Sequence, residues 1–277
     1  MNRGALILIG STMAVAGAGM AGPGIPAGPD LPPGSTASTA LAQDPADPPY
    51  NGQYTFIRIR FDVSDMRGMG GFGGRNRGRG GGREPAWAHD YPRAETNFAK
   101  ILDATTLIDT YQEGYSGRVL TLDDPELFKY PIASIIEVGS WRPSELEVTR
   151  LRDYLLKGGF LIVDDFRGSA VNNFQYQMQR VLPDHIIQYV PMDHEIFDSF
   201  FYIDDPSRLV PPYGRDIPQY LGIFEDNDLN GRIMAMINWN QDLQEYWEFS
   251  DAGYYPIDLS NEAYQFGVNY LIYAFTH

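Results

Sequence analysis

The sequence predicts an α/β fold in which a mainly parallel sheet lies between two layers of helices, a three-layer sandwich. Short apolar runs, typical of buried strands, alternate with longer segments that carry apolar residues at helical spacing. This alternation continues over most of the chain. Hydrophobic residues make up 43% of the 277 residues, which is enough for a packed core.

The first strands are predicted on either side of a helix. Residues 54–63, YTFIRIRFDV, mix aromatic and β-branched side chains, which is typical of a strand. Residues 95–108 have helical spacing, and residues 117–124 follow as a second strand. A strand, a helix and a strand in this order predict a parallel pair.

The middle of the chain repeats this pattern. Residues 130–140 contain a continuous apolar run, as expected of a strand buried on both faces. The clearest helix lies in residues 144–159, where Ser144 is the expected N-cap, Glu147 completes a capping box and Gly158 ends the helix.

The next strand is predicted at residues 160–166, FLIVDDF, which end in two adjacent carboxylates before the final Phe. A helix at 172–182 and a short strand at 185–191 follow, so four or five parallel strands alternate with helices. Residues 220–240 predict two strands joined by a tight hairpin turn at Asn230-Gly231. An amphipathic helix at 261–277 is expected to pack on the sheet.

The first 21 residues have the pattern of a signal peptide. Arg3 precedes an apolar run and small residues, and cleavage is expected after Ala21 or as late as Ala42. The alternative is an uncleaved anchor, but the run is rich in Gly and Ala and falls short of the roughly 20 apolar residues of a spanning helix. We therefore expect export to the periplasm or cell envelope, with no further membrane insertion.

Two low-complexity stretches surround the start of the predicted domain. Residues 22–52 predict a disordered linker, and the α/β domain is expected at 53–277 with a Gly/Arg-rich loop inserted at 67–84. Such Gly-Arg segments can bind RNA. However, the formal net charge of −15 repels phosphate backbones, so a flexible loop is expected and nucleic acid is not. The loop arginines could instead contact the acidic body.

Several classes of chemistry are excluded by the residues themselves. The chain has no cysteine, which excludes thiol nucleophiles, disulfides and thiolate metal sites. It also lacks a Gly-x-Ser-x-Gly elbow and a phosphate-binding P-loop. Asp226-x-Asp228-x-Asn230 begins like a calcium loop, but Ile237 stands where the closing carboxylate is needed, so we expect an acidic hairpin.

A series of short motifs, spread from residue 54 to the end of the chain, resembles the bacterial domain of unknown function 4159 family. The motifs are Trp87-Ala88-His89-Asp90-Tyr91-Pro92 with Glu95, Asn97 and Phe98; Leu127-Phe128-Lys129-Tyr130-Pro131; Leu151-Arg152-x-Tyr154-Leu155 with Gly158-Gly159-Phe160; Asp164-Asp165; Pro191-x-Asp193-His194-x-Ile196-Phe197; Gly231-Arg232; and Gly267-Val268-Asn269-Tyr270.

This resemblance implies a flavodoxin-like fold, similar to class I glutamine amidotransferase domains. It also implies a bacterial envelope context in which such domains accompany ATPase and von Willebrand-type partners. It supplies no established activity. Amidotransferases of that fold use a cysteine nucleophile, so their chemistry is excluded in this chain.

Acidic residues gather where the predicted strands end. Ligands of open parallel sheets bind beyond the carboxyl ends of the strands, because loops and helix N-termini converge there. The candidate ligand-binding residues at these ends are Asp90, Glu137, Asp164, Asp165, Asp193 and His194. Alternation along a strand sends Asp164 and Asp165 to opposite faces.

Four of these residues are the candidate metal ligands: Asp164, Asp165, Asp193 and His194. Together they could bind a divalent cation, or hold a water for attack on an ester, amide or glycosidic bond.

A structural alternative assigns these residues to capping and pairing. In that interpretation Asp164 caps the following turn and Asp165 pairs with Arg167 or Arg152. His194 then caps or packs beside the helix expected after it.

The aromatic run WNQDLQEYWEFSDAGYY, residues 239–255, also allows two interpretations. It could form a sugar-binding face, or its aromatic residues could pack in the core and loops. The leading functional hypothesis is a non-catalytic binding or scaffold domain that meets an envelope protein partner. The alternative is a metal-assisted hydrolase, which requires the acidic and histidine side chains to converge.

Overall fold

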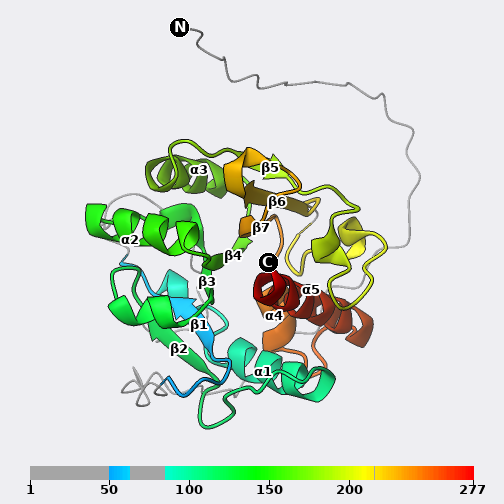
Figure 1. Cartoon of the computed structure of the whole chain (residues 1–277). Coiled ribbons are helices and arrows are strands. Elements are labelled where there is room, and N and C mark those ends of the chain that lie inside the picture. Colours follow the sequence, from blue (N-terminus) through cyan, green and yellow to red (C-terminus); the bar gives the residue numbers. More distant parts are fainter. Residues whose placement is uncertain (1–49, 63–84, 215) are drawn as a thin grey trace, which may run out of the picture. The chain divides into compact units, whose positions relative to one another are not determined.

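The computed structural model describes residues 50–62, 85–214 and 216–277, all within one compact unit, Thr39–His277 (Figure 1). The predicted signal peptide, the arginine-rich loop and the linker before Tyr50 lie outside the described residues. Seven strands form one sheet in the order β2-β1-β3-β4-β7-β6-β5.

The sheet is mainly parallel, as predicted. Strands β1, β2, β3, β4 and β7 pair in parallel, and β6 runs antiparallel to both of its neighbours. The strands are β1 (Phe56–Ile59), β2 (Gly117–Leu120), β3 (Ile132–Ile136), β4 (Phe160–Phe166), β5 (Ile187–Tyr189), β6 (Gln219–Phe224) and β7 (Ile233–Trp239).

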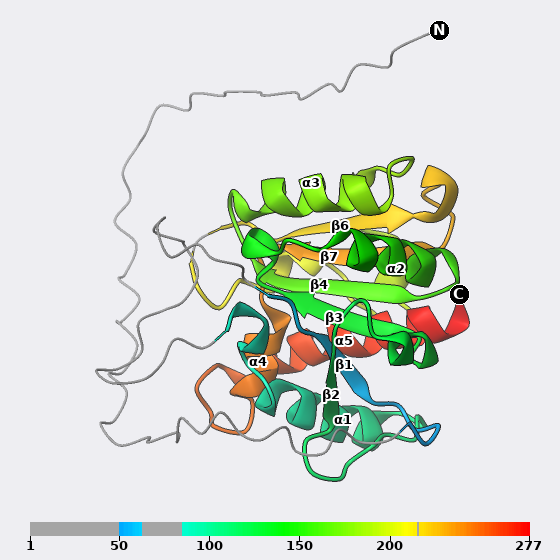
Figure 2. The same cartoon turned by 90° about the vertical axis from the view of Figure 1, so that its left-hand side faces the viewer.

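Helices cover both faces of the sheet, which confirms the three-layer sandwich. The helices are α1 (Arg93–Thr105), α2 (Glu145–Leu156), α3 (Ala170–Val181), α4 (Leu243–Glu248) and α5 (Ile257–Thr276). Helices α2 and α3 lie on one face, and α1, α4 and α5 lie on the other (Figures 1 and 2). No helix within the described ranges has the length and apolar character needed to cross a membrane.

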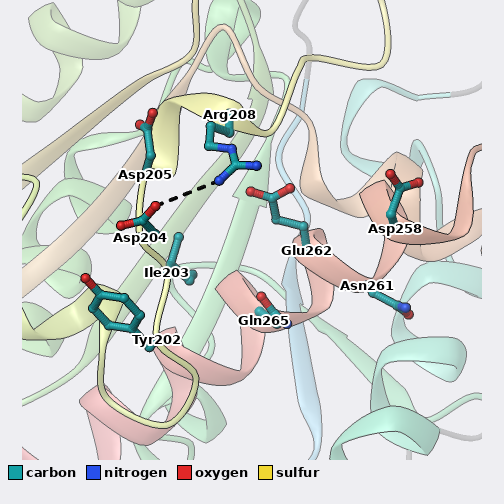
Figure 3. Close-up of a pocket in the computed structure, with 9 residues that line it drawn as sticks. All are labelled: Tyr202, Ile203, Asp204, Asp205, Arg208, Asp258, Asn261, Glu262 and Gln265. Atoms are coloured by element: carbon teal, nitrogen blue, oxygen red, sulfur yellow. Dashed lines mark ion pairs between the residues drawn. The ribbon is translucent and has the colours of Figure 1, made fainter.

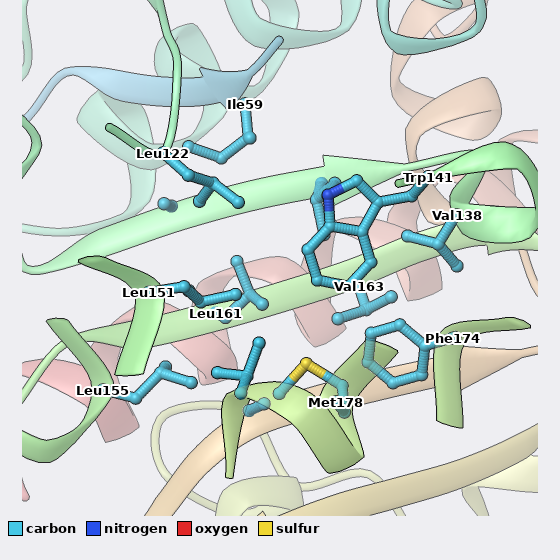
Figure 4. Close-up of a cluster of buried hydrophobic side chains, with 14 of the residues drawn as sticks. Ile59, Leu122, Val138, Trp141, Leu151, Leu155, Leu161, Val163, Phe174 and Met178 are labelled. Atoms are coloured by element: carbon cyan, nitrogen blue, oxygen red, sulfur yellow. The ribbon is translucent and has the colours of Figure 1, made fainter. Parts of the chain in front are cut away.

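Strand β4 is buried on both faces, which explains its continuous apolar sequence. Leu161 and Val163 face α2 and α3, whereas Phe160 and Ile162 face the opposite layer. In the α2/α3 layer, the Trp141 ring stacks on Phe174 with centroids 6.2 Å apart, beside the sheet residues drawn in Figure 4. This dense packing holds the end of β4 in place.

The predicted capping box of α2 is confirmed. The Ser144 side chain accepts a hydrogen bond from Glu147 N, and Ser144 N donates to the Glu147 carboxylate over 2.8 Å. Gly158 follows the helix with a φ of +106°, a conformation that favours glycine.

The connection of the predicted hairpin is longer than the tight turn expected at Asn230-Gly231. Strands β6 and β7 are antiparallel, but residues 225–232 connect them, and the positive φ angles belong to Asp226 and Asn227. Gly231 is needed for close packing instead, because a Cβ there would lie 2.9 Å from the Glu225 carbonyl oxygen. Strand β7 is also central, between β4 and β6.

Two helix assignments also differ from the sequence patterns. The segment from His194 forms only a 3₁₀ turn, Glu195–Phe197. Conversely, the aromatic run contains helix α4. Because α4 has only six residues, the apolar spacing of the run did not indicate a helix.

A buried ion pair connects β1 to α1 beneath the sheet. Arg58 Nε donates to Glu95 Oε1 over 2.7 Å, and both side chains are fully buried. The Arg58 guanidinium also donates to the side chain of Gln244 in α4. Helices α1 and α4 are therefore linked to the central strands by charge as well as by apolar packing.

We predict that Glu95→Gln destabilises the chain by about 3–5 kcal/mol, because it leaves the Arg58 guanidinium buried without a counter-charge. Urea unfolding followed by circular dichroism measures this loss. The double variant Arg58→Met, Glu95→Leu should lose less, because neither charge is then buried. A single variant as stable as the parent chain would contradict the prediction.

Candidate functional site

Six side chains converge at the carboxyl edge of the sheet, and we call them the His89 carboxylate cluster. Two groups of potential ligand atoms overlap at His89, and within each group all atoms lie within 4.8 Å of one another. The first group is His89, Asp90, Asp242 and Glu245, and the second is His89, Glu137 and Asp165. The full cluster is His89, Asp90, Glu137, Asp165, Asp242 and Glu245.

The ends of neighbouring strands and the segments that follow strands supply these residues. Glu137 directly follows β3, Asp165 lies at an irregularity near the end of β4, and His89 and Asp90 precede α1. Asp90, Glu137 and Asp165 have φ angles of 64°, 50° and 47°. This left-handed region is uncommon for residues other than glycine, and it is often found at functional sites.

Helix α4 supplies the other two carboxylates. Asp242 is its N-cap and accepts a hydrogen bond from Glu245 N over 2.9 Å. Because α4 begins only a few residues after β7, its first turn lies at the same edge as the ends of β3 and β4. Tyr255 Oη donates to Glu245 Oε1 over 2.9 Å and fixes that side chain further.

His89 lies between the buried acids and solvent. Its Nδ1 is 2.7 Å from Asp165 Oδ2 and 3.5 Å from Asp90 Oδ1. The His89 side chain is 34% exposed, whereas that of Asp90 is fully buried. The cluster therefore has a buried interior and one edge that water can reach.

Several carboxylate oxygens in this interior lack an N–H or hydroxyl donor among the described residues and meet other carboxyl groups instead. They are both oxygens of Asp90, Oδ2 of Asp242 and Oε2 of Glu245. Burying such a group is unfavourable unless a proton, a cation or water compensates. These oxygens are consequently the strongest evidence for a ligand at this edge.

The electrostatics of the cluster agree with this geometry. Burial, followed by neighbouring carboxylates, raises the pKa values of Asp90 and Asp165 well above the usual range. Burial likewise raises the pKa of Asp242, with Asp165 and Asp164 adding to the effect. The pKa of Glu248, a nearby acid that faces Asp90, is also raised by burial. A cation would remove the repulsion that disfavours these charges.

Asp164, although adjacent to Asp165, has a different environment. Its Oδ1 accepts a hydrogen bond from Asn238 Nδ2 over 3.0 Å, and its Oδ2 accepts from the backbone N–H groups of Leu243 and Gln244. Burial raises its pKa to about 6, although these donors oppose the shift. Asp164 thus holds the start of α4 and has little capacity left for a ligand.

The structure does not bring Asp193 and His194 to this cluster. The His194 ring lies 5.7 Å from that of Tyr273, whose hydroxyl accepts a hydrogen bond from Ile233 N at the start of β7. Asn238, which donates a hydrogen bond to Asp164, is five residues further along β7 than Ile233. At about 3.3 Å per residue, the two positions are roughly 16 Å apart, so His194 and Asp164 lie near opposite ends of β7.

This separation arises because the chain turns back after β5. His194 N donates to the Pro191 carbonyl, and His194 Nδ1 then accepts from Ile196 N, which makes His194 an N-cap. The predicted metal set of Asp164, Asp165, Asp193 and His194 therefore needs correction, since only Asp165 of the four belongs to the cluster. Asp165 pairs with His89, whereas Arg167 and Arg152 donate to the backbone carbonyls of Tyr213 and Val181.

Sequence reasoning missed His89, Asp242 and Glu245. His89 precedes the candidate Asp90, so the adjacent pair was a usable signal. Asp242 and Glu245 have the spacing of a helix N-cap and its third residue, which marks a helix start. Their position beside Asp165 depends on where β7 lies in the sheet.

The aromatic run mostly serves the core. Tyr246 and Trp247 are buried, whereas Tyr254 is 48% exposed. A separate hollow near α5 shares no residue with the His89 carboxylate cluster, and Arg208 and Asp204 form an ion pair of 3.8 Å within it (Figure 3). Its acids already have a cation beside them, which makes it a weaker candidate.

We predict that the metal-free chain becomes less stable as the pH rises from about 5 to about 8. An unfolded Asp has a pKa near 3.9, and raised folded-state pKa values mean that the folded chain holds these protons more tightly. The resulting stabilisation is complete below about pH 4. It is lost as the pH rises through the raised pKa values of the folded chain, of which that of Asp164 is about 6.

Urea unfolding midpoints with a chelator present test this prediction. Asp90→Asn should flatten the pH dependence, because Asn cannot ionise. The lowered pKa of His194 makes the folded chain more stable as the pH rises, which opposes the predicted trend. This contribution is the same in the parent chain and in Asp90→Asn, so it cancels when their pH dependences are compared. An identical pH dependence in the parent and the variant would contradict the prediction.

Comparison with known families supports the resemblance noted in the sequence. The family model described as "Domain of unknown function (DUF4159)" matches residues 78–275, more than two thirds of the 277-residue chain. The curated proteins include no match to the chain. The chain belongs to the domain of unknown function 4159 family.

Proposed function

We propose that this chain binds a divalent cation at the His89 carboxylate cluster and uses it to hydrolyse a substrate. The observation that carries the proposal is the group of fully buried carboxylate oxygens without donors, on Asp90, Asp242 and Glu245, beside a partly exposed histidine. Carboxylate oxygens at this spacing are suitable ligands for hard cations.

Electrostatic repulsion makes the unoccupied cluster unfavourable. Two like charges about 4 Å apart repel by about 4 kcal/mol at an effective dielectric constant near 20. The cluster holds three carboxyl groups in one set of ligand atoms within 4.8 Å and two in the other. Such crowding can be accommodated by protonation, as the raised pKa values of Asp90 and Asp242 indicate, or by a cation. At neutral pH a divalent cation compensates these charges without requiring protons.

The chemistry of hydrolysis needs an activated water and a proton acceptor. A bound divalent cation lowers the pKa of a coordinated water. His89 is partly exposed, and its Nδ1 lies 2.7 Å from Asp165 Oδ2, so this side chain can hold the cation or accept a proton at the edge that water reaches. These features support attack on an ester, amide or glycosidic bond.

We predict that the full 277-residue chain, stripped with a chelator, binds at least one of Ca²⁺, Mg²⁺, Mn²⁺ and Zn²⁺ with micromolar affinity. Isothermal titration calorimetry measures the affinity. Asp90→Asn and Glu245→Gln should weaken binding at least tenfold, because each removes a buried ligand charge.

Asp193→Asn is the matched control, because Asp193 lies outside the cluster, and it should bind like the parent chain. Absence of binding for all four cations would overturn the proposed function. So would binding that Asp90→Asn and Glu245→Gln leave unchanged, since the cation would then occupy another site.

Hydrolysis is a separate prediction. The cation-loaded chain should cleave at least one nitrophenyl ester, nitroanilide or nitrophenyl glycoside. His89→Gln should lower the rate by at least a hundredfold, because it removes a side chain that contacts the reacting water or its cation. Absorbance at saturating cation gives the rates. A loaded chain that cleaves none of these compounds would be a binding module and not a hydrolase.

A second candidate is a non-catalytic binding or scaffold domain of the cell envelope. It is favoured by an apolar cavity of about 430 Å³ at the opposite edge of the sheet, before β1 and β3 and beside the end of α5. Tyr54, Tyr130, Ile272 and Phe275 are among its lining residues. Export and an envelope protein partner remain part of this second proposal.

A further inference from the structure

We propose that the His89 carboxylate cluster is a centre for two adjacent divalent cations. The inference rests on the proposed function and specifies how many cations the site holds. One cation is bound by the buried trio Asp90, Asp242 and Glu245. The other is bound by the outer trio His89, Glu137 and Asp165.

The distances between the ligand atoms separate the six residues into these two trios. Within each trio the potential ligand atoms lie within 4.8 Å of one another, and His89 is equally close to the buried trio. Each of the six residues is then used once. Because His89 is near both groups, the two cation positions are neighbours and not independent sites.

The two trios also differ in chemistry and access. The buried trio offers only carboxylate oxygens, which suit a hard cation. The outer trio adds a histidine nitrogen, and its His89 and Glu137 are partly exposed. A substrate would therefore meet the outer cation.

Charge balance favours two cations over one. The cluster contains five carboxyl groups, so one divalent cation leaves three negative charges without compensation and two cations leave one. Among the neighbouring arginines, Arg167 acts on Glu137, an outer member of the cluster, and Arg93 acts on Glu248, which lies outside it. Uncompensated buried charges are strongly unfavourable.

Asp90 provides an independent indication of a ligand at the junction of the two trios. Its side chain is fully buried, and neither oxygen accepts a hydrogen bond from an N–H or hydroxyl donor among the described residues, although the Glu248 carboxyl group lies against it. Its Oδ1 nevertheless points toward the outer trio, 3.5 Å from His89 Nδ1. A carboxylate in this position would hold the buried cation and also compensate the charge of a second cation beside it.

Mn²⁺ is the appropriate probe, because it accepts oxygen and nitrogen ligands and is paramagnetic. Equilibrium dialysis of the full chain against Mn²⁺ at neutral pH should give two bound ions per chain. Low-temperature electron paramagnetic resonance should show that the two ions are magnetically coupled. Glu137→Gln should reduce the content to one ion and abolish the coupling.

Two further variants make the result specific. His89→Gln should also reduce the content to one ion, and it decides the question if Glu137→Gln fails to fold by circular dichroism. Glu126→Gln is the control, because Glu126 is a carboxylate paired with Lys129 outside the cluster, and it should retain two coupled ions.

The outcomes separate this inference from the proposed function. One ion per chain, unaffected by Glu137→Gln and His89→Gln, would overturn the two-cation centre and leave the single-cation proposal intact. Two ions without magnetic coupling would show distant sites and would also overturn the inference. No bound Mn²⁺, together with no binding of the other three cations, would overturn both.

Discussion

The Asp164 carboxylate holds together the three elements on which the candidate site is built. It extends from β4, accepts a hydrogen bond from Asn238 of β7, and accepts two more from the backbone at the start of α4. A helix of six residues is not stable by itself in water. The position of α4, and with it the positions of Asp242 and Glu245, therefore depends on this one buried carboxylate.

The same interaction belongs to a larger buried network. Asn238 Oδ1 accepts from Tyr270 of α5, and Gln244 donates to Ser134 of β3 and accepts from Arg58 of β1. Polar groups in a low-dielectric interior are stabilising when all are paired and costly when they are not. The network thus fixes the helices of one layer against four neighbouring strands. This rigidity lets the adjacent His89 carboxylate cluster keep its charges close together.

The paired and unpaired carboxylates at this edge have different roles. Asp164 is fully bonded and structural, whereas Asp90, Asp242 and Glu245 each retain buried oxygens without donors. Left-handed backbone at Asp90, Glu137 and Asp165 also stores strain that the surrounding packing has to offset. These features meet at one edge of the sheet, and their convergence is the basis on which we propose a ligand there.

The sequence by itself determined the α/β class, because the periodicity of strands and helices is local and hydrophobic burial enforces it. It also placed Glu137 and Asp165 at strand ends and expected Asp90 at the same edge, since parallel strands end at a common edge. Only the tertiary structure decided which acids meet. Strand β7 inserts between β4 and β6 and carries Asp242 and Glu245 to the cluster, while the chain after β5 turns His194 away. The order of strands in a sheet is set by long-range packing, and no local pattern in the sequence contains it.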